Sequence, residues 1–381
     1  MNEQSSDLPD MRITTVPGNC CPPQGQVQVI PQRLEQPFVA GFVDTPAGRV
    51  PKISSELSCT DHWGAFKVRW GISRMDYKVE PGLYALGDPD VKSSVLVTAN
   101  YKLSFDNLRG SLPGRNCWVL VLDTKGINVW CAAGKGTFGT QELVGRIESS
   151  GLPHVVSHQK LILPQLAAPG VTAHQVKKLS GFEVLYGPVR TRDLPAFLDN
   201  GLKATAQMRL KTFTTRERAA LIPVELVGTL IPGLLIMTIF FLVGGLGGPG
   251  GFWVNALRHG LFTVLCLVAA LLAGAVLTPL LLPWLPGRAY SLKGMTMGLI
   301  VVGALLVFRS GEITNLKELL EISGWFLMVP AVASYLAMNF TGSSTYTSLS
   351  GVKKEMKWAV PVELSGAGVG LCLWLGSHFL I

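Results

Sequence analysis

Long apolar runs fill the last part of this 381-residue chain. A helix needs about 20 mostly apolar residues to cross a bilayer. Five stretches meet or approach that length, at roughly 221–245, 261–283, 292–308, 320–340 and 359–380. We therefore predict an all-α transmembrane domain of five helices over residues 221–381, in which the third helix is the shortest.

Shorter apolar runs alternate with helical patterns in the preceding part. Runs bounded by turn residues predict buried parallel strands at 93–100, 117–124, 154–158 and 182–187. Helical spacing, with a Thr near the start and a Gly at the end, predicts helices at 140–151 and 172–181. This alternation is typical of an open, Rossmann-like α/β sheet, which binds ligands at the carboxyl ends of its strands.

The pattern divides the chain into four segments. Residues 1–60, rich in Pro, Gly and Gln at first, are expected to form an extended, partly ordered lead, and residues 61–205 the α/β domain. Residues 206–220 are a linker to the membrane domain, 221–381. Charge supports this division, since residues 1–220 carry 25 Lys or Arg and 19 Asp or Glu, whereas the rest carry 8 and 6.

Composition narrows the class of protein. With 48% hydrophobic and 15% charged residues, the chain is too apolar for a disordered protein or for an ordinary soluble one. The net charge is +8, and positive residues border the predicted spans. That placement indicates the lipid bilayer as a partner, and nucleic acid is not expected.

The distribution of Lys and Arg predicts the orientation, because cytoplasmic loops carry an excess of them. Eight flank one side of the spans and three the other: Lys211, Arg216, Arg218, Arg288, Lys293, Lys353, Lys354 and Lys357 against Arg258, Arg309 and Lys317. The start of the chain, MNEQSSDLPD, lacks the apolar core of a signal peptide. We expect a multi-pass protein of the cytoplasmic (inner) membrane, with its α/β domain in the cytoplasm and its C-terminus outside.

The tetrapeptide Pro-Val-Glu-Leu opens both the first and the fifth span, at Glu225 and Glu363. Buried carboxylates are costly and often functional. These two could instead be interfacial acids that bond the ends of neighbouring helices, or they could orient the soluble domain by pairing with Lys353, Lys354 or Arg218.

A glycine-rich loop follows the strand predicted at 117–124. Gly134-x-Gly136-x-x-Gly139 matches the dinucleotide fingerprint, but the acidic residue expected about 20 positions later is missing. A phosphate-binding P-loop also fails, because Gly136 and not Ser or Thr follows Gly134-Lys135.

The same loop reads Asn128-Val-Trp-Cys-Ala-Ala-Gly-Lys135. This octapeptide resembles, at every position, the signature of the mercury-methylating corrinoid protein of anaerobic microbes. That family joins a cytoplasmic corrinoid domain to a five-span membrane domain. The resemblance extends to 163–173 and 339–358 and covers roughly residues 90–381.

The resemblance implies a corrinoid-dependent methyltransferase that moves a methyl group from a cobalt corrinoid to inorganic Hg(II), forming methylmercury. It implies Cys131 as the catalytic residue and the lower axial ligand of cobalt. The expected cofactor-binding residues are Asn128, Val129, Trp130, Cys131, Ala132, Ala133, Gly134, Lys135, Gly136, Thr137, Gln165, Ala168, Gly170, Val171, Gly187 and Pro188. The resemblance also implies a methyl donor from folate-type carbon metabolism. The chain lacks a four-cysteine motif for an iron–sulfur cluster of its own, so the expected electron donor is a separate ferredoxin-like iron–sulfur protein.

The residue chemistry agrees with this role for Cys131. A thiolate is a soft, strongly donating ligand, and the start of a helix favours it. Hg(II) is an electrophile, so its methylation needs a carbanion-like or radical methyl group, which a donating ligand opposite the methyl would favour. The glycines at 134, 136 and 139 would let the backbone approach a large flat macrocycle, and Lys135 would add positive charge.

The remaining cysteines and histidines have simpler interpretations. We expect Cys117, Cys266 and Cys372 to be core residues. The Cys20-Cys21 pair could capture Hg(II). His154 and His158 would share one face of a strand without fixing a metal geometry.

Two other functions stay open. The chain could be a corrinoid methyl carrier whose physiological acceptor is not mercury. It could also be a membrane transporter or sensor whose soluble domain only binds a ligand.

Overall fold

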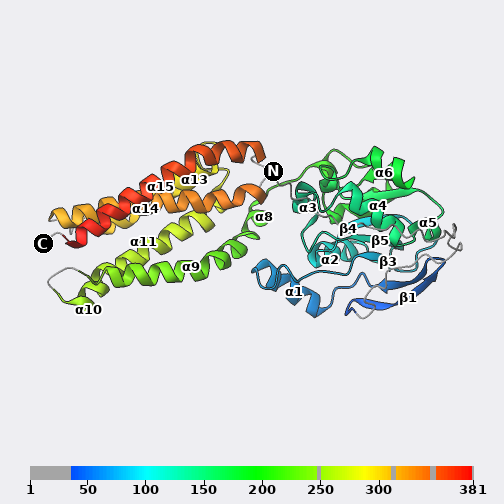
Figure 1. The fold of residues 1–381 in the computed structure, drawn as a ribbon, viewed down its shortest axis with the longest axis horizontal. Coiled ribbons are helices and arrows are strands. Elements are labelled where there is room, and N and C mark those ends of the chain that lie inside the picture. Colours follow the sequence, from blue (N-terminus) through cyan, green and yellow to red (C-terminus); the bar gives the residue numbers. More distant parts are fainter. Residues whose placement is uncertain (1–35, 247–249, 310–314, 344–348, 380–381) are drawn as a thin grey trace, which may run out of the picture.

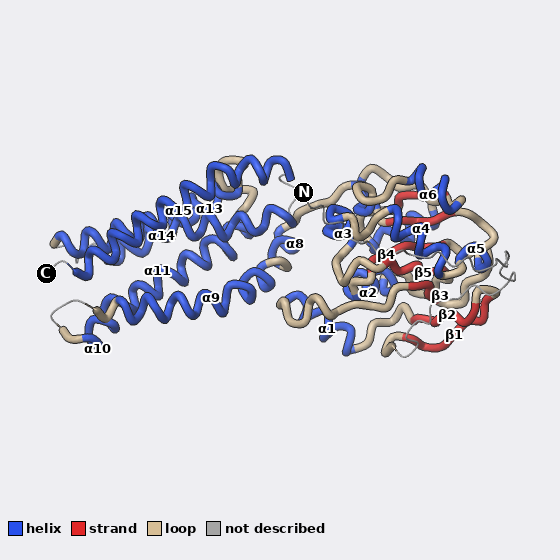
Figure 2. The backbone as a smooth tube through the Cα atoms, viewed as in Figure 1, coloured by secondary structure: helices blue, strands red, loops and turns tan. Residues whose placement is uncertain are grey.

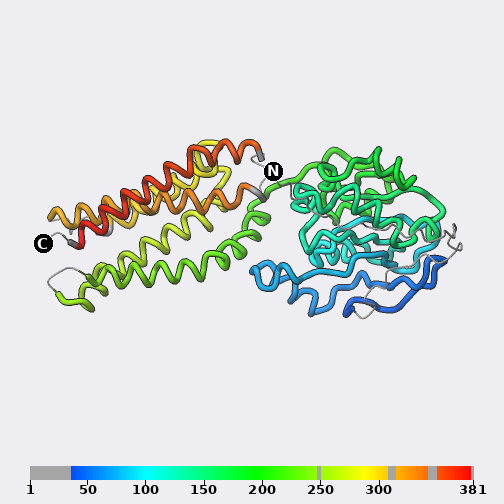
Figure 3. The backbone as a smooth tube through the Cα atoms, viewed as in Figure 1, coloured from blue at the N-terminus to red at the C-terminus, as the bar shows by residue number. Residues whose placement is uncertain are grey.

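The computed structural model describes residues 36–246, 250–309, 315–343 and 349–379. These residues form a sheet domain and a long helical bundle that lie end to end (Figure 1). The chain passes from the sheet domain into the bundle once, through the segment around residue 210 (Figure 3). Cys20 and Cys21 lie outside the described residues. The predicted architecture is confirmed: an α/β sheet domain precedes five long apolar helices.

Seven strands form one mixed sheet in the order β1-β2-β3-β5-β4-β6-β7 (Figure 2). The strands are β1 (Val39–Thr45), β2 (Gly48–Ile53), β3 (Gly82–Leu86), β4 (Val95–Ala99), β5 (Cys117–Leu122), β6 (Lys160–Leu163) and β7 (Glu183–Tyr186). The half made of β5, β4, β6 and β7 is parallel, whereas β3 runs antiparallel to β5 and β1 antiparallel to β2. The ligand-binding edge expected of a parallel sheet therefore belongs to one half only.

Helices cover both faces of this sheet. They are α1 (Cys59–Arg69), α2 (Lys102–Gly110), α3 (Val129–Lys135), α4 (Thr140–Ser149), α5 (Leu152–Val155), α6 (Ala173–Ser180) and α7 (Leu194–Asp199). Side chains of β4 alternate between two cores, with Val95 and Val97 on one face and Leu96 on the other. The first core packs against α3 to α6 and the second against α2 and α7, so the central strands are buried on both sides, as continuous apolar runs require.

Two predictions about the sheet domain need correction. The strand predicted at 154–158 is wrong, because helix α5 occupies Leu152–Val155 and the strand, β6, begins at Lys160. Gly151 has a φ of 64° and Pro153 lies in the first helical turn, where its missing N–H costs nothing, so the chain turns into a helix there. The N-terminal segment assigned to a lead also contributes to the sheet, since its described part contains β1 and β2.

The helical part contains five helices long and apolar enough to cross a membrane. They cover Thr215–Val243, Phe252–Leu281, Tyr290–Val307, Leu316–Thr341 and Ser350–His378. The first consists of α8 (Thr215–Ala219) and α9 (Ile222–Val243). The second combines α10 (Phe252–Asn255), α11 (Leu261–Leu272) and α12 (Thr278–Leu281) with π-helical turns at Ala256–Gly260 and Ala273–Leu277. The last three are α13 (Tyr290–Arg309), α14 (Leu316–Met338) and α15 (Leu349–Phe379).

Glycines let the central helices of the bundle approach closely. A Cβ at Gly294 of α13 would lie 2.6 Å from the carbonyl oxygen of Ala333, and a Cβ at Gly298 would lie 2.5 Å from the Cα of Pro330. These two glycines are four residues apart on one face of α13, the spacing with which small residues bring membrane helices together.

The two spans' acids bond to α14 and not to the basic residues proposed as partners. The amide of Asn339, which ends α14, donates to the Glu225 carboxylate, and the Ser334 hydroxyl donates to Glu363 at 2.5 Å. Arg218 instead donates to backbone oxygens of Phe213 and Leu280. Among the described residues no ion pair joins these acids to Lys353, Lys354 or Arg218, and Glu225 matches the alternative of an acid that bonds a helix end.

Cysteine placement is as expected at two of three positions. Cys117 and Cys266 are buried in the sheet core and the bundle core, and burial raises the pKa of the Cys117 thiol to about 12. Cys372 is exposed on α15, so the expectation of a core position is wrong there.

Candidate functional site

A cleft of about 830 Å³ opens at the carboxyl ends of the parallel strands. Thr98 near the end of β4, Pro164 after β6 and Val189 after β7 form its floor. Residues of α2 and the first residues of α3 form two walls, and residues 211–220, which lead into the first span, close a third side. This is the edge at which open α/β sheets bind ligands.

Helix α3 places Cys131 at the rim of this cleft. Asn128 is the N-cap residue, and its Oδ1 accepts the backbone N–H of Cys131 at 2.9 Å. The thiol of Cys131 is exposed, one position after the cleft-lining residues Asn128, Val129 and Trp130. Gly136 ends the helix with a φ of 82°, a conformation that favours glycine. The signature thus encodes a short helix with a cap at each end and a thiol in its first turn.

The opposite face of α3 fixes the helix on the sheet. Ala132 and Ala133 are buried in the core, while Gly134 and Lys135 are exposed. Nothing lies within 4 Å of the position that a Cβ would take at Gly134, so the backbone there faces open space. Thr137 donates weakly from its hydroxyl to the carbonyl oxygen of Ala132.

Gly170 holds α3 in place from the loop after β6. A Cβ at this position would overlap the Phe138 carbonyl oxygen and would lie 2.9 Å from the Cα and 3.0 Å from the carbonyl oxygen of Ala133. The glycine is therefore required by the close approach of two backbones. It supports the helix that carries Cys131, without lining the cleft.

The other predicted residues lie behind the rim. Gln165 accepts a hydrogen bond from Arg209 at 3.2 Å, and the Val171 carbonyl accepts one from Tyr186. Gly187 and Pro188 are buried and line a smaller cavity of about 50 Å³ against α7, which adjoins the cleft and shares Pro164 and Val189 with it. Ala168 lies on the same loop as Gly170 and is not a lining residue of either cavity. Of the predicted cofactor-binding residues, Asn128, Val129 and Trp130 line the cleft.

Five basic side chains that the sequence pattern did not identify as ligand-binding line the cleft: Arg69, Arg190, Arg192, Lys211 and Arg216. Glu217 is the acidic residue among the lining residues, and it pairs with Lys211 at 2.7 Å. The surplus of positive charge suits a ligand with an anionic group. Arg190 and Arg192 follow a correctly predicted strand, so their position at its carboxyl end could have identified them as candidate ligand-binding residues.

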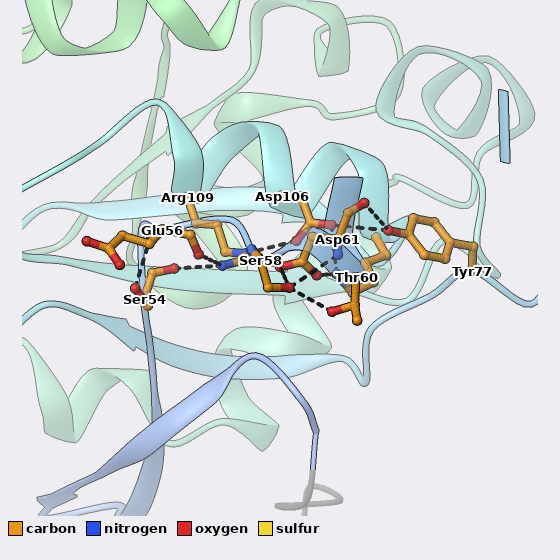
Figure 4. A network of polar contacts seen from close by, with 9 residues as sticks. Ser54, Glu56, Ser58, Thr60, Asp61, Tyr77, Asp106 and Arg109 are labelled. Atoms are coloured by element: carbon orange, nitrogen blue, oxygen red, sulfur yellow. Dashed lines mark hydrogen bonds and ion pairs between the residues drawn. The ribbon is translucent and has the colours of Figure 1, made fainter. Parts of the chain in front are cut away.

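A buried ionic network fixes the wall formed by α2 (Figure 4). Arg109 of α2 donates to Asp61 of α1 at 2.7 Å and to Asp106 at 2.8 Å, and Lys102 donates to both carboxylates. Burial alone would raise the pKa of Asp61, but hydrogen bonds from Lys102, Ser58 and Arg109 outweigh it and hold this pKa well below its usual range. The network joins α1 to α2 and so keeps the cleft-lining residues of α2 in position.

Comparison with known proteins relates this domain to one group of enzymes. The family model of the CO dehydrogenase/acetyl-CoA synthase delta subunit matches residues 72–198. The gamma subunit of the acetyl-CoA decarbonylase/synthase complex of Methanopyrus kandleri is 36% identical over 128 residues, which are 33% of this chain and 27% of that protein. The corresponding subunit of Methanocaldococcus jannaschii is 35% identical over 129 residues, 33% of this chain and 26% of that protein.

The sheet domain is related to these subunits. The matched stretch contains α2, the strands β3 to β7 and the whole of α3, so it includes the helix that carries Cys131. The chain spans about a quarter of the length of these relatives. The match ends before the five apolar helices.

Proposed function

We propose that the chain is a membrane-anchored corrinoid protein that methylates inorganic Hg(II), in which the Cys131 thiolate would hold the cobalt. The observation that carries this proposal is the exposed thiol of Cys131, which the Asn128 cap holds at the rim of a cleft of about 830 Å³. Relatedness of the domain to subunits of acetyl-CoA synthase and decarbonylase complexes supports it.

The residues around the cleft fit a corrinoid. The cleft is large and open, and the uncovered backbone at Gly134 would let a flat macrocycle lie against α3. Trp130 offers an aromatic side chain, about one third exposed, on the same wall. The basic side chains around the cleft would suit the phosphate of a nucleotide tail.

Residues of α3 and its N-cap then have defined roles. A bound corrinoid would supply a cobalt-held methyl group, chemistry that no protein side chain offers. Cys131 would hold the cobalt of the corrinoid through its sulfur. Asn128 would keep the thiol-bearing turn in place, and Ala132 and Ala133 would keep the helix on the sheet. Hg(II) would approach as the substrate from the open side of the cleft.

Anaerobic purification of the full chain tests this function. We expect about one cobalt per chain and a corrinoid absorption spectrum. Cys131→Ala should abolish methylmercury formation while the protein still accumulates in the membrane. Cys59→Ala is the matched control, because Cys59 is also an exposed cysteine of the sheet domain but begins α1, away from the cleft lining. Full methylation by Cys131→Ala would disprove the thiolate mechanism.

Partners and orientation belong to the same proposal. We propose a separate ferredoxin-like iron–sulfur protein as the electron donor and a folate-type methyl donor, with the sheet domain on the cytoplasmic side. Reduction of the bound cofactor by purified ferredoxin-like proteins would test the electron donor. Protease access in sealed inside-out vesicles would test the orientation, since only a cytoplasmic sheet domain is digested there.

A methyl carrier with another acceptor is the second candidate. It is favoured by the comparison itself, because the relatives are subunits of acetyl-CoA decarbonylase/synthase complexes. Single-turnover transfer from the methylated protein separates the two. Fast transfer to Hg(II) supports a mercury methyltransferase, whereas transfer to another acceptor at a much higher rate supports the carrier.

A further inference from the structure

An exposed apolar surface extends along α1 and the turn that follows it. It consists of Trp63, Phe66, Trp70, Ile72 and Met75, which we call the docking element. The rings of Trp63 and Phe66 stack at 5.3 Å, and Phe66 contacts Trp70 at 5.9 Å, so the three aromatic residues form one row. Asp61, Gly64 and Val68, on the other side of α1, are buried against the domain. The aromatic row therefore lies on the side of α1 that does not pack against the sheet domain.

The turn after α1 lies beside the first span. A Cβ at Gly71 would contact a methyl group of Val227 at 3.9 Å. Val227 is five residues into α9, or about 7.5 Å along a helix with a rise of 1.5 Å per residue. Ile72, which follows Gly71 directly, is 52% exposed, and Met75 is 61% exposed. Because Ile72 and Met75 lie so close to Gly71 in sequence, both stay near the level at which α9 enters the apolar part of the bilayer.

Basic residues accompany these apolar side chains. Lys67 and Arg69 lie in the last turn of α1, and Arg74 lies between Ile72 and Met75. Long basic side chains extend from apolar surroundings to lipid phosphates, and Trp is enriched at the headgroup level. Asp76, next to Met75, is the acidic residue of this turn.

We propose that the docking element inserts into the inner-leaflet headgroup region and binds anionic phospholipid, as a second attachment besides the five spans. The occupant is the bilayer because the element continues the surface of the first span and pairs apolar side chains with positive charge. The attachment would fix the side of the sheet domain on which Arg69 lines the cleft. It does not depend on the identity of the ligand in the cleft.

Photocrosslinking in the full chain tests this attachment. A benzophenone amino acid replaces Ile72 in one variant and Val91 in another, and the proteins are placed in nanodiscs of phosphatidylglycerol and phosphatidylcholine. Val91 is the matched control because it is also 52% exposed but precedes β4, at the amino ends of the parallel strands, whereas Arg69 of α1 lines the cleft at their carboxyl ends. We expect phospholipid adducts at position 72 in at least tenfold excess over position 91.

Charge removal gives the second arm. Arg74→Gln should speed tryptic cleavage after Arg69 or Lys67 about fivefold in phosphatidylglycerol nanodiscs, since one basic residue near an anionic surface contributes about 1 kcal/mol. In pure phosphatidylcholine the variant and wild type should be cleaved at equal rates. Lys178→Gln removes a charge from α6 and should change neither rate.

Two results would overturn the proposal. Equal phospholipid adducts at positions 72 and 91 would show that the element does not touch the bilayer. Adducts at position 72 that join to protein would show that a second copy or a partner covers it. A loss of corrinoid binding with lipid adducts intact would contradict the proposed function alone.

Discussion

Replacing Gly170 by alanine tests whether the loop after β6 positions the helix that carries Cys131. The added Cβ would lie 2.9 Å from the Cα of Ala133, a contact about 0.5 Å shorter than the 3.4 Å at which ordinary packing begins. Its closest neighbours are backbone atoms, which cannot rotate away, so α3 or the loop must shift. Overpacking of this kind costs about 1–3 kcal/mol. We expect a less stable sheet domain and, because Cys131 moves with α3, a lower content of bound corrinoid.

The measurements are the thermal unfolding temperature of the full chain and the cobalt content after anaerobic purification. Gly145→Ala is the matched control, because Gly145 lies inside α4 with no atom within 4 Å of the added Cβ. Alanine in an open helical position should raise stability by up to about 1 kcal/mol. A Gly170→Ala protein that unfolds like wild type and binds as much cobalt would refute the reasoning.

Three further predictions follow from the same geometry. Asn128→Ala should lower the free energy of unfolding by about 1 kcal/mol and reduce the corrinoid content, because it removes the acceptor of the Cys131 N–H. Asn128→Asp should retain the stability and the corrinoid content, since aspartate also caps helices. Thermal unfolding and cobalt analysis measure the two quantities. The pKa of Asp61 is lower in the folded protein than in the unfolded chain, so this carboxylate stabilises the fold above its unfolded pKa, and the stabilisation is lost as the pH falls. The unfolding temperature of Asp61→Asn should therefore decline less steeply than that of wild type below about pH 4. Thr212→Val should speed cleavage of the linker by trypsin, because the Thr212 hydroxyl bonds both Arg190 and Glu217. Thr205→Val, which removes only a local bond from the Met208 N–H, should have a smaller effect.

The central strands were predictable because burial on both faces leaves an uninterrupted apolar run. β4 and β5 are such runs, and both lie within the predicted strands at 93–100 and 117–124. The hairpin of β1 and β2 was not predicted, since its strands include Gly41 and Pro51, which weaken the strand pattern, and only β2 contacts the rest of the sheet. The antiparallel placement of β3 against β5 depends on a long-range pairing that no local pattern reports.

The part of the site that lies in one contiguous segment was predictable from the sequence. Residues Asn128 to Gly136 specify a cap, a helix and a glycine stop, so the position of Cys131 follows from local rules. The charge of the cleft comes from residues scattered between Arg69 and Arg216, which only the fold brings together. Gly187 and Pro188 were expected at the ligand because they follow a strand, but they line a smaller cavity that adjoins the cleft at Val189.

The linker at residues 206–220 makes specific contacts with both the sheet domain and the spans. Arg190 of the sheet domain donates to Thr212, and Arg218 donates to the backbone oxygen of Leu280 in the second span. A Cβ at Gly71 would also contact Val227 of the first span at 3.9 Å. These contacts restrict the rotation of the sheet domain about residues 206–220. Arg216 at the start of the first span lines the cleft together with Lys211 of the preceding linker, so an unrelated anchor that replaces the chain from Thr215 onward would alter the candidate site itself.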